Sequence, residues 1–169
     1  MFVAFFLLYL VSFSRSQELD DDFDEFAIPT EKIITFTHDQ VYDMAEVIMK
    51  TMDKAFESRN YTDLLNLLGP DIQFTVCQLQ GTTVEGLKVY LEDNEVLKKV
   101  KKSQHDIIYY PQNDGVQIVD VHGFRFDYRK YFLLKENHMI RTGGTLIVRT
   151  QYGKIEIVRA IEYCPETIF

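Results

Sequence analysis

The sequence predicts an α+β domain in which three helices pack on one face of a curved, mixed and mostly antiparallel sheet. Apolar residues recur at helical spacing in residues 37–68 and again in residues 83–102. A short alternating segment, residues 72–77, separates these two regions, and from residue 105 onward most of the chain alternates as strands do. Helices that are segregated from a run of strands indicate a layer of helices on a sheet.

The chain begins with an apolar run, residues 1–11, that is shorter than the ~20 residues needed by a membrane-spanning helix. This is the length of the apolar region of a secretory signal peptide, and small residues follow at Ser14 and Ser16. No Lys or Arg precedes the run, so a short uncut N-terminal anchor is the alternative. We expect residues 1–16 to be a signal peptide cut before Gln17, and the mature protein to be extracellular.

Residues 17–36 are acidic and aperiodic, and we interpret them as a flexible arm before a single domain in residues 37–169. The whole chain has a net charge of −8, and removing a leader that contains Arg15 makes it −9. An acidic protein repels nucleic acid and anionic membranes, so we expect no nucleic-acid partner. No second long apolar segment occurs, so we expect no membrane span after processing.

The first helix is predicted to begin after Thr37, which has Gln40 three residues on in a capping-box pattern. Asn60 can cap a short second helix, which Gly69 and Pro70 end. The apolar stripe of the first helix consists of Val41, Met44, Ala45, Ile48, Met52, Ala55 and Phe56.

A first strand is predicted over residues 72–77, followed by a third helix that Thr83 caps and that runs to about residue 102. Four lysines lie within residues 98–102, at the expected C-terminal end of this helix, where cations suit the helix dipole. A site for a sulfated glycan or a phosphate is the alternative interpretation of this basic cluster. Later strands are predicted over residues 105–110, 116–121, 128–134, 145–150 and 154–163.

Two stretches together resemble a known superfamily. Residues 55–74 read AFESRNYTDLLNLLGPDIQF, a helix, a turn, a leucine-rich helix, Pro-Asp and a strand. Residues 153–163 read GKIEIVRAIEY, a closing strand after a Gly-Lys turn. Over residues 38–164 the chain resembles the nuclear transport factor 2-like superfamily, which includes ketosteroid isomerase-like and SnoaL-like proteins. The resemblance implies a cone-shaped fold with a pocket between sheet and helices, and homodimers through the outer sheet face.

The resemblance supplies no known catalytic set. In ketosteroid isomerase-like members a carboxylate base, a helix tyrosine and a buried strand acid perform the chemistry. The matching places here hold Val76, Met52 and Gly144 or Thr145, and none of these can move or donate a proton as required. The His–Asp pair of hydratase-like members has no counterpart that the sequence reveals.

We therefore expect a secreted, noncatalytic domain that binds a small apolar ligand or a protein partner. The alternative is a SnoaL-like isomerase, cyclase or hydratase with another polar set, which would involve Glu162, Tyr109 or His105. The pocket is expected to be open, or else filled by its own large side chains. Its expected lining residues are Met52, Phe56, Phe74, Val76, Tyr109 and Glu162.

The two cysteines, Cys77 and Cys164, are an even number in a chain expected to be secreted, which favours pairing. In the resembling fold the first and last strands are parallel neighbours and each cysteine ends one of them, which implies a Cys77–Cys164 disulfide. Asn60, Tyr61 and Thr62 form the only N-x-S/T sequon, so we expect an N-glycan on Asn60. The four histidines show no ligand-like spacing, so we expect no metal site and no cofactor.

Overall fold

The structure is a computed structural model, and it describes residues 36–108, 116–120, 122–135, 137–151 and 153–168. These residues belong to one compact unit, Ile33–Phe169. The expected leader lies outside the described residues, as do Tyr109 and all of the expected acidic arm except its last residue. Within the described ranges no helix is long and apolar enough to cross a membrane.

Helices come first and strands dominate the second half, as the sequence predicts. The described elements are, in chain order, α1 (His38–Ser58), α2 (Thr62–Leu65), β1 (Leu68–Val76), β2 (Leu79–Gly81), α3 (Val84–Asp93), the short 3-10 helix η1 (Leu97–Lys99), β3 (Val100–Ile107), β4 (Val116–Asp120), β5 (Gly123–Leu134), β6 (Met139–Gln151), β7 (Lys154–Glu162) and β8 (Glu166–Thr167).

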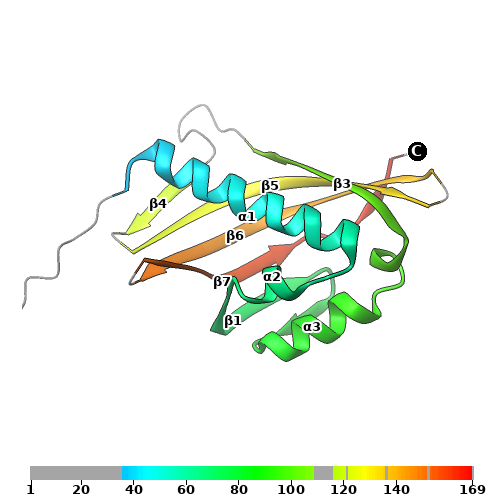
Figure 1. Cartoon of the computed structure of the whole chain (residues 1–169), viewed down its shortest axis with the longest axis horizontal. Coiled ribbons are helices and arrows are strands. Elements are labelled where there is room, and N and C mark those ends of the chain that lie inside the picture. The colour runs from blue at the N-terminus through cyan, green and yellow to red at the C-terminus, as the bar shows by residue number, and fades with distance from the viewer. Residues whose placement is uncertain (1–35, 109–115, 121, 136, 152, 169) are drawn as a thin grey trace, which may run out of the picture. The chain divides into compact units, whose positions relative to one another are not determined.

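The strands form one mixed sheet in the order β2-β1-β7-β6-β5-β3, with β4 paired to β5 and β8 paired to β6. β1 and β7 run parallel, whereas the other described strand pairs are antiparallel. Figure 1 shows α1 crossing the long strands, with α2 and α3 next to β1. The expected α+β class is confirmed.

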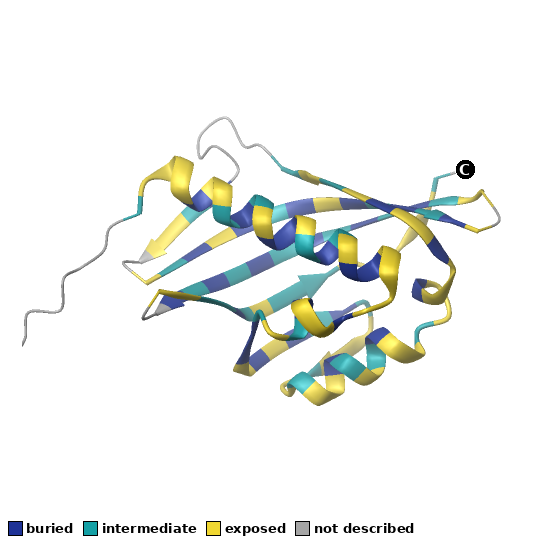
Figure 2. Cartoon of the chain, in the orientation of Figure 1, coloured by how far each residue is buried: buried dark blue, intermediate teal, exposed yellow. Residues whose placement is uncertain are grey.

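Alternation along the strands turns one face of the sheet toward the helices (Figure 2). In β5 every second residue from 124 to 134 is buried, which is the pattern of a strand with one covered face. Phe132 of this row meets Phe56 of α1 edge to face, with ring centroids 5.2 Å apart. Burying one such side chain contributes about 1.5–3 kcal/mol, so this contact helps to hold α1 on the sheet. The predicted capping box of Thr37 and Gln40 is present at the start of α1.

The third helix is shorter than the sequence predicts. Thr83 caps α3 as expected, but the helix ends at Asp93, because Asn94 turns extended and its side-chain oxygen accepts hydrogen bonds from two following backbone N–H groups. The lysines of residues 98–102 therefore lie in η1 and at the start of β3. The prediction that these lysines lie at the C-terminal end of the third helix is wrong: Lys98 and Lys99 lie in the last turn of η1, and Lys101 and Lys102 lie in β3.

Several strands are longer than predicted. β1 begins at Leu68 instead of Ile72, since an irregular register between Leu68 and Gln73 accommodates Pro70, which has no N–H to donate. Of the residues around the predicted strand of residues 128–134 that were left unassigned, 123–127 belong to β5 and 139–144 belong to β6. These two strands pair with each other from one end to the other.

The predicted disulfide between Cys77 and Cys164 is confirmed, with Cα atoms 4.3 Å apart. The parallel pairing of β1 with β7 produces it. Val76 lies opposite Glu162 in this pair, and the Cys77 N–H donates to the Glu162 carbonyl at 2.9 Å. Both cysteines therefore leave their strands at the same level of the sheet.

Candidate functional site

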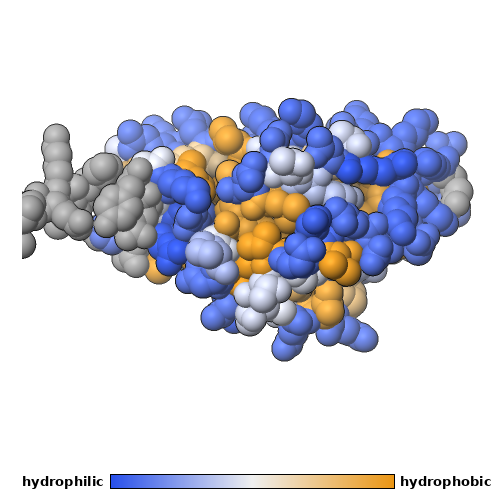
Figure 3. Space-filling view, turned by 60° about the horizontal axis from the view of Figure 1, so that its bottom comes forward, coloured by the Kyte–Doolittle hydropathy of each residue, from blue (hydrophilic) through white to orange (hydrophobic). Residues whose placement is uncertain are grey.

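A cavity of about 50 Å³ lies between the helices and the covered face of the sheet. Its walls come from α1, α2, α3, η1 and four strands and are mainly apolar. We call it the inner cavity. Three of its lining residues, Tyr90, Tyr128 and Glu162, carry polar groups. Figure 3, which brings the lower side of Figure 1 forward, shows apolar side chains at the centre of that face within a hydrophilic rim.

Tyr128 and Glu162 form a polar pair on the sheet wall of the inner cavity. The Tyr128 hydroxyl donates to Glu162 Oε2 over 3.0 Å, and Tyr128 is only 1% exposed. Burial raises the pKa of the Glu162 carboxyl, and the Lys130 charge and the Tyr128 hydrogen bond offset this only in part. Burial, followed by the Glu162 charge, raises the pKa of Tyr90 to about 12. Burial also raises the pKa of Tyr128 well above its ordinary value. The hydroxyls of Tyr90 and Tyr128 therefore stay protonated and can donate hydrogen bonds.

The sheet register explains why Tyr128 and Glu162 meet. Tyr128 of β5 lies opposite Gly144 of β6, which lies opposite Glu162 of β7. A Cβ atom on Gly144 would come within 2.0 Å of the Ile161 carbonyl oxygen. Only glycine permits this approach of β6 and β7. It also leaves no side chain between the tyrosine and the carboxylate.

Lys130 lies two residues beyond Tyr128 on the same face of β5 and is fully buried. Its Nζ lies 3.3 Å from Asp53 Oδ1 and 4.5 Å from the centroid of the Phe56 ring. The two groups are within ion-pair distance, but Nζ has no hydrogen-bond partner among the described residues. Burial lowers the pKa of Lys130 to about 8, although the carboxylates of Asp53 and Glu162 act in the opposite direction.

Asp53 of α1 connects Lys130 to β3. Its Oδ1 accepts a hydrogen bond from the Ser103 hydroxyl at 2.6 Å, and its Oδ2 lies 2.5 Å from His105 Nδ1. The other ring nitrogen of His105, Nε2, lies 3.6 Å from Glu46 Oε2. Burial would raise the pKa of Asp53, but the Lys130 charge and the hydrogen bonds from Ser103 and His105 outweigh it and lower this pKa. Asp53 is therefore held as a carboxylate.

Two adjacent rows of the sheet carry these polar groups. His105 of β3, Lys130 of β5 and Thr142 of β6 are opposite one another in one row, and the Tyr128–Glu162 row is next to it. Together they place an amine, a carboxyl and a hydroxyl with displaced pKa values beside an apolar cavity. Such clusters occur at sites that bind polar groups of a ligand or move protons.

Four of the residues expected to line the pocket, Met52, Phe56, Val76 and Glu162, lie on the wall of the inner cavity. Phe74 is buried but lies elsewhere, because its ring is directed at Gly81 and Gly86 under α3. Tyr109, the remaining expected residue, is outside the described residues.

The sequence interpretation missed Tyr128, Lys130 and Asp53. It also found no His–Asp pair, whereas Asp53 and His105 are in contact. One signal was available: every second residue from 124 to 134 faces inward, and all of these residues are aromatic or aliphatic except one lysine. A lysine in such a row must be buried and partnered. In the described part of the chain, no group of three or more His, Cys, Asp or Glu is arranged to hold a metal ion.

Asn60, the expected glycosylation site, lies in the exposed turn between α1 and α2. Its side-chain oxygen accepts a hydrogen bond from the Thr62 N–H at 3.1 Å. This contact uses the amide oxygen of Asn60 and not the nitrogen to which a glycan would be attached.

The chain is similar to known proteins in structure alone, since no family model and no curated protein matches its sequence. A protein of unknown function from Shewanella oneidensis MR-1, described as NTF2-like, has a TM-score of 0.60 at 9% identity, covering 73% of this chain and 99% of its own. An NTF2-like protein of unknown function from an Exiguobacterium species has a TM-score of 0.50 at 15% identity, with coverages of 72% and 97%.

An enzyme is among the similar structures as well. A hexachlorocyclohexane dehydrochlorinase, LinA type 2, has a TM-score of 0.56 at 13% identity, and the match covers 78% of this chain and 92% of the enzyme. At this level of identity the likeness concerns architecture and not chemistry. The element order, the parallel pairing of β1 with β7 and these similar structures lead to one conclusion: the domain has the nuclear transport factor 2-like fold.

Proposed function

We propose that the domain binds, in the inner cavity, a small and mainly apolar molecule that carries one hydrogen-bonding group. The observation that supports this most is the Tyr128–Glu162 pair on the wall of an otherwise apolar cavity. Apolar walls bind by excluding water, and a few convergent polar groups fix the orientation of a ligand. A cavity of about 50 Å³ holds only a few water-sized atoms, so the ligand has few non-hydrogen atoms unless the helices move.

A pair of isosteric probes tests this binding. 2-Butanone and 2-methyl-1-butene have the same shape, but only the ketone accepts a hydrogen bond. We expect saturable NMR shifts at cavity residues with both probes, and tighter binding of the ketone by roughly fivefold, as one hydrogen bond of about 1 kcal/mol gives. Tyr128→Phe combined with Glu162→Leu should abolish the preference for the ketone.

A cavity-filling variant provides the matched control. Ala160 lines the inner cavity, so Ala160→Val should weaken both probes by tenfold or more. Val89→Ile adds carbon on the exposed side of α3 and should change neither affinity. Probe shifts outside the cavity, or shifts that Ala160→Val leaves unchanged, would contradict the proposal.

A second candidate function is acid–base turnover at the same cavity. The displaced pKa values of Glu162 and Lys130 favour it, because proton transfer is most efficient when the pKa lies near the working pH. The chemistry required is proton abstraction next to an electron-withdrawing group. The dehydrochlorinase among the similar structures is named for the removal of hydrogen chloride, a reaction in which the substrate loses a proton.

Deuterium exchange distinguishes the two functions. In D₂O an acid–base site should exchange the protons next to the carbonyl of 2-butanone faster than buffer does. Glu162→Gln should lower that exchange by about 10²–10⁴-fold. If the protons of 2-butanone exchange only at the rate seen in buffer while the ketone binds saturably, the function is noncatalytic binding.

Secretion and homodimerisation remain proposals that follow from the sequence. The disulfide between Cys77 and Cys164 supports secretion, since such bonds persist in oxidising compartments. Sedimentation equilibrium on the mature protein tests whether the chain dimerises through the outer face of its sheet. A sedimenting mass of one chain at all concentrations would exclude the dimer.

A further inference from the structure

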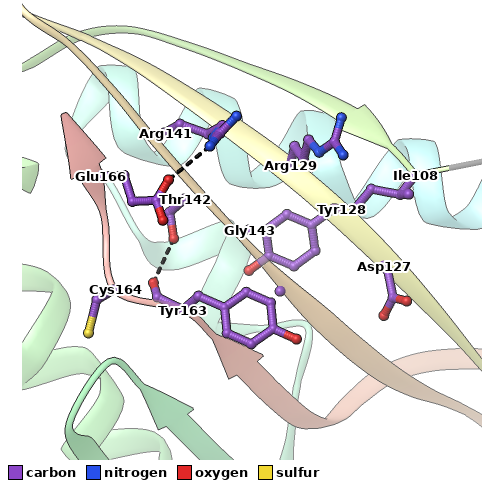
Figure 4. Close-up of a pocket in the computed structure, with 11 residues that line it drawn as sticks. Ile108, Asp127, Tyr128, Arg129, Arg141, Thr142, Gly143, Tyr163, Cys164 and Glu166 are labelled. Carbon is purple, nitrogen blue, oxygen red and sulfur yellow. Dashed lines mark hydrogen bonds and ion pairs between the residues drawn. The ribbon is translucent and has the colours of Figure 1, made fainter. Parts of the chain in front are cut away.

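The face of the sheet that points away from the helices contains a hollow of about 280 Å³, which we call the outer slot. It lies where β5, β6 and the end of β7 run side by side, with β8 at its edge. Figure 4 shows Gly143 in its middle, Arg129 on one side and Tyr163 on the other. The residues used below as its walls are Asp127, Arg129, Arg141, Gly143, Tyr163 and Glu166.

One cross-strand row forms the slot. Arg129 of β5 lies opposite Gly143 of β6, and the Tyr163 N–H donates to the Gly143 carbonyl at 2.8 Å on the other side. Two large side chains therefore flank a residue with no side chain, and the space above the glycine stays empty. A Cβ atom on Gly143 would come within 2.7 Å of the Tyr128 carbonyl oxygen, so the strand geometry itself requires glycine here.

Among the described residues, every charged side chain around the slot except that of Arg129 has a partner of opposite charge or a hydrogen bond. Arg141 pairs with Glu166 at 2.8 Å, and Asp127 accepts a hydrogen bond from Thr145 and lies 3.9 Å from Arg125. Arg129 is exposed and forms no ion pair or hydrogen bond with any described residue, although Asp106 lies opposite it on β3. The slot thus contains one unmatched guanidinium.

An aromatic surface accompanies this unmatched charge. Tyr163 is 63% exposed, the highest value among the large hydrophobic residues of the described chain. An exposed ring beside a flat glycine floor suits a second planar ring. A guanidinium suits a carboxylate, because two parallel N–H groups meet two oxygens. The two features lie on opposite sides of Gly143, so one planar molecule can reach both.

We propose that in the single chain the outer slot is a second binding site, independent of the inner cavity, for a planar aromatic carboxylate. A dimer through this face would cover the slot, so the titration below uses protein that sediments as one chain, and a dimer that persists at all concentrations would exclude the proposal. The carboxylate binds Arg129, and the ring lies over Gly143 against Tyr163. A slot of about 280 Å³ accommodates a single-ring fragment. Benzoate is the simplest such molecule, and a fragment of this size is expected to bind with a Kd on the order of 1 mM.

An NMR titration of the mature protein with benzoate tests the proposal. Shifts should concentrate on residues of the slot. Arg129→Gln and Tyr163→Ala should each weaken binding about fivefold or more. Arg159→Gln is the matched control, because Arg159 is an exposed arginine of β7 that does not line the slot, and it should change the Kd less than twofold.

Two further probes separate specific recognition from simple charge attraction. Acetate lacks the ring and benzyl alcohol lacks the charge, and both should bind at least fivefold more weakly than benzoate. The proposal is wrong if Arg129→Gln and Arg159→Gln weaken benzoate equally, if acetate binds as well as benzoate, or if no slot residue shifts. Spectra of each variant without ligand verify that the fold is retained, which is expected because both arginines are exposed.

Discussion

Replacing Lys130 with methionine is expected to stabilise the domain at neutral pH. Lys130 is fully buried, and its Nζ has no hydrogen-bond partner among the described residues. Methionine has a similar length and no charge, so it can fill the same space between Phe56 and Phe132. The variant removes the desolvation of an ammonium group in the core.

The pKa of Lys130 gives the size of the effect. A shift from the ordinary 10.5 to about 8 means that the charged form is disfavoured in the folded chain by about 3 kcal/mol. This value already includes the attraction of Asp53, which keeps its hydrogen bonds from Ser103 and His105 in the variant. We therefore expect Lys130→Met to raise the free energy of unfolding by up to about 3 kcal/mol at pH 7.

The pH dependence is a stricter test than the magnitude. Between pH 8 and 10.5 Lys130 binds fewer protons in the folded chain than in the unfolded one, so the wild type gains stability as pH rises through this window. The methionine variant lacks this gain. The difference between the two proteins should therefore be largest below pH 8 and shrink toward pH 10.5.

Urea unfolding with the disulfide intact measures both quantities, with Lys102→Met on the exposed side of β3 as the control that should change little. A Lys130→Met protein that is less stable than wild type at pH 7 would refute the reasoning. It would show that the ion pair with Asp53 outweighs the burial of the lysine.

Three other predictions concern maturation and the covalent structure. Replacing Cys77 and Cys164 by alanine should lower the free energy of unfolding by about 4–5 kcal/mol, as expected when a crosslink with a sequence separation of 87 is lost; an unchanged urea midpoint would contradict this. Asn60 should carry an N-glycan after eukaryotic secretion, so N-glycosidase should lower the mass, and Asn60→Gln should abolish that change. N-terminal sequencing of secreted protein should begin at Gln17, whereas an intact leader would show that it is an anchor.

Local pattern was sufficient to predict most of the fold. The capping box at Thr37 and the helical stripe after it predicted α1, and the period-two segments predicted β1 and β7. The third helix was predicted to be too long, because the helical spacing of apolar residues continues past Asn94. The hydrogen bonds of the Asn94 side chain end the helix there. A competing side-chain contact of this kind changes the boundary of an element without changing its periodicity.

The candidate site was much less accessible from the sequence. Tyr128 and Glu162 are 34 residues apart, and Asp53 and His105 are 52 apart, so their contacts depend on strand order and register. Four of the six predicted pocket residues came from the first helix and first strand, which a local resemblance places well; Tyr109 and Glu162 were the other two. Apart from Asp53 of α1, the polar groups come from β3, β5 and β7, whose mutual alignment no short segment encodes.

One dipeptide links the two sites proposed on this sheet. Successive residues of a strand point to opposite faces, so Gly143 faces the outer side and Gly144 the inner side of β6. Gly144 lets the Tyr128 hydroxyl reach Glu162, and Gly143 leaves the outer slot open beside Arg129. A side chain at Gly144 would meet backbone atoms of β7, and a side chain at Gly143 would meet backbone atoms of β5. The close approach of β5, β6 and β7 thus requires glycine at both positions, which leaves space on both faces of the sheet. The polar groups of the two proposed sites lie next to that space.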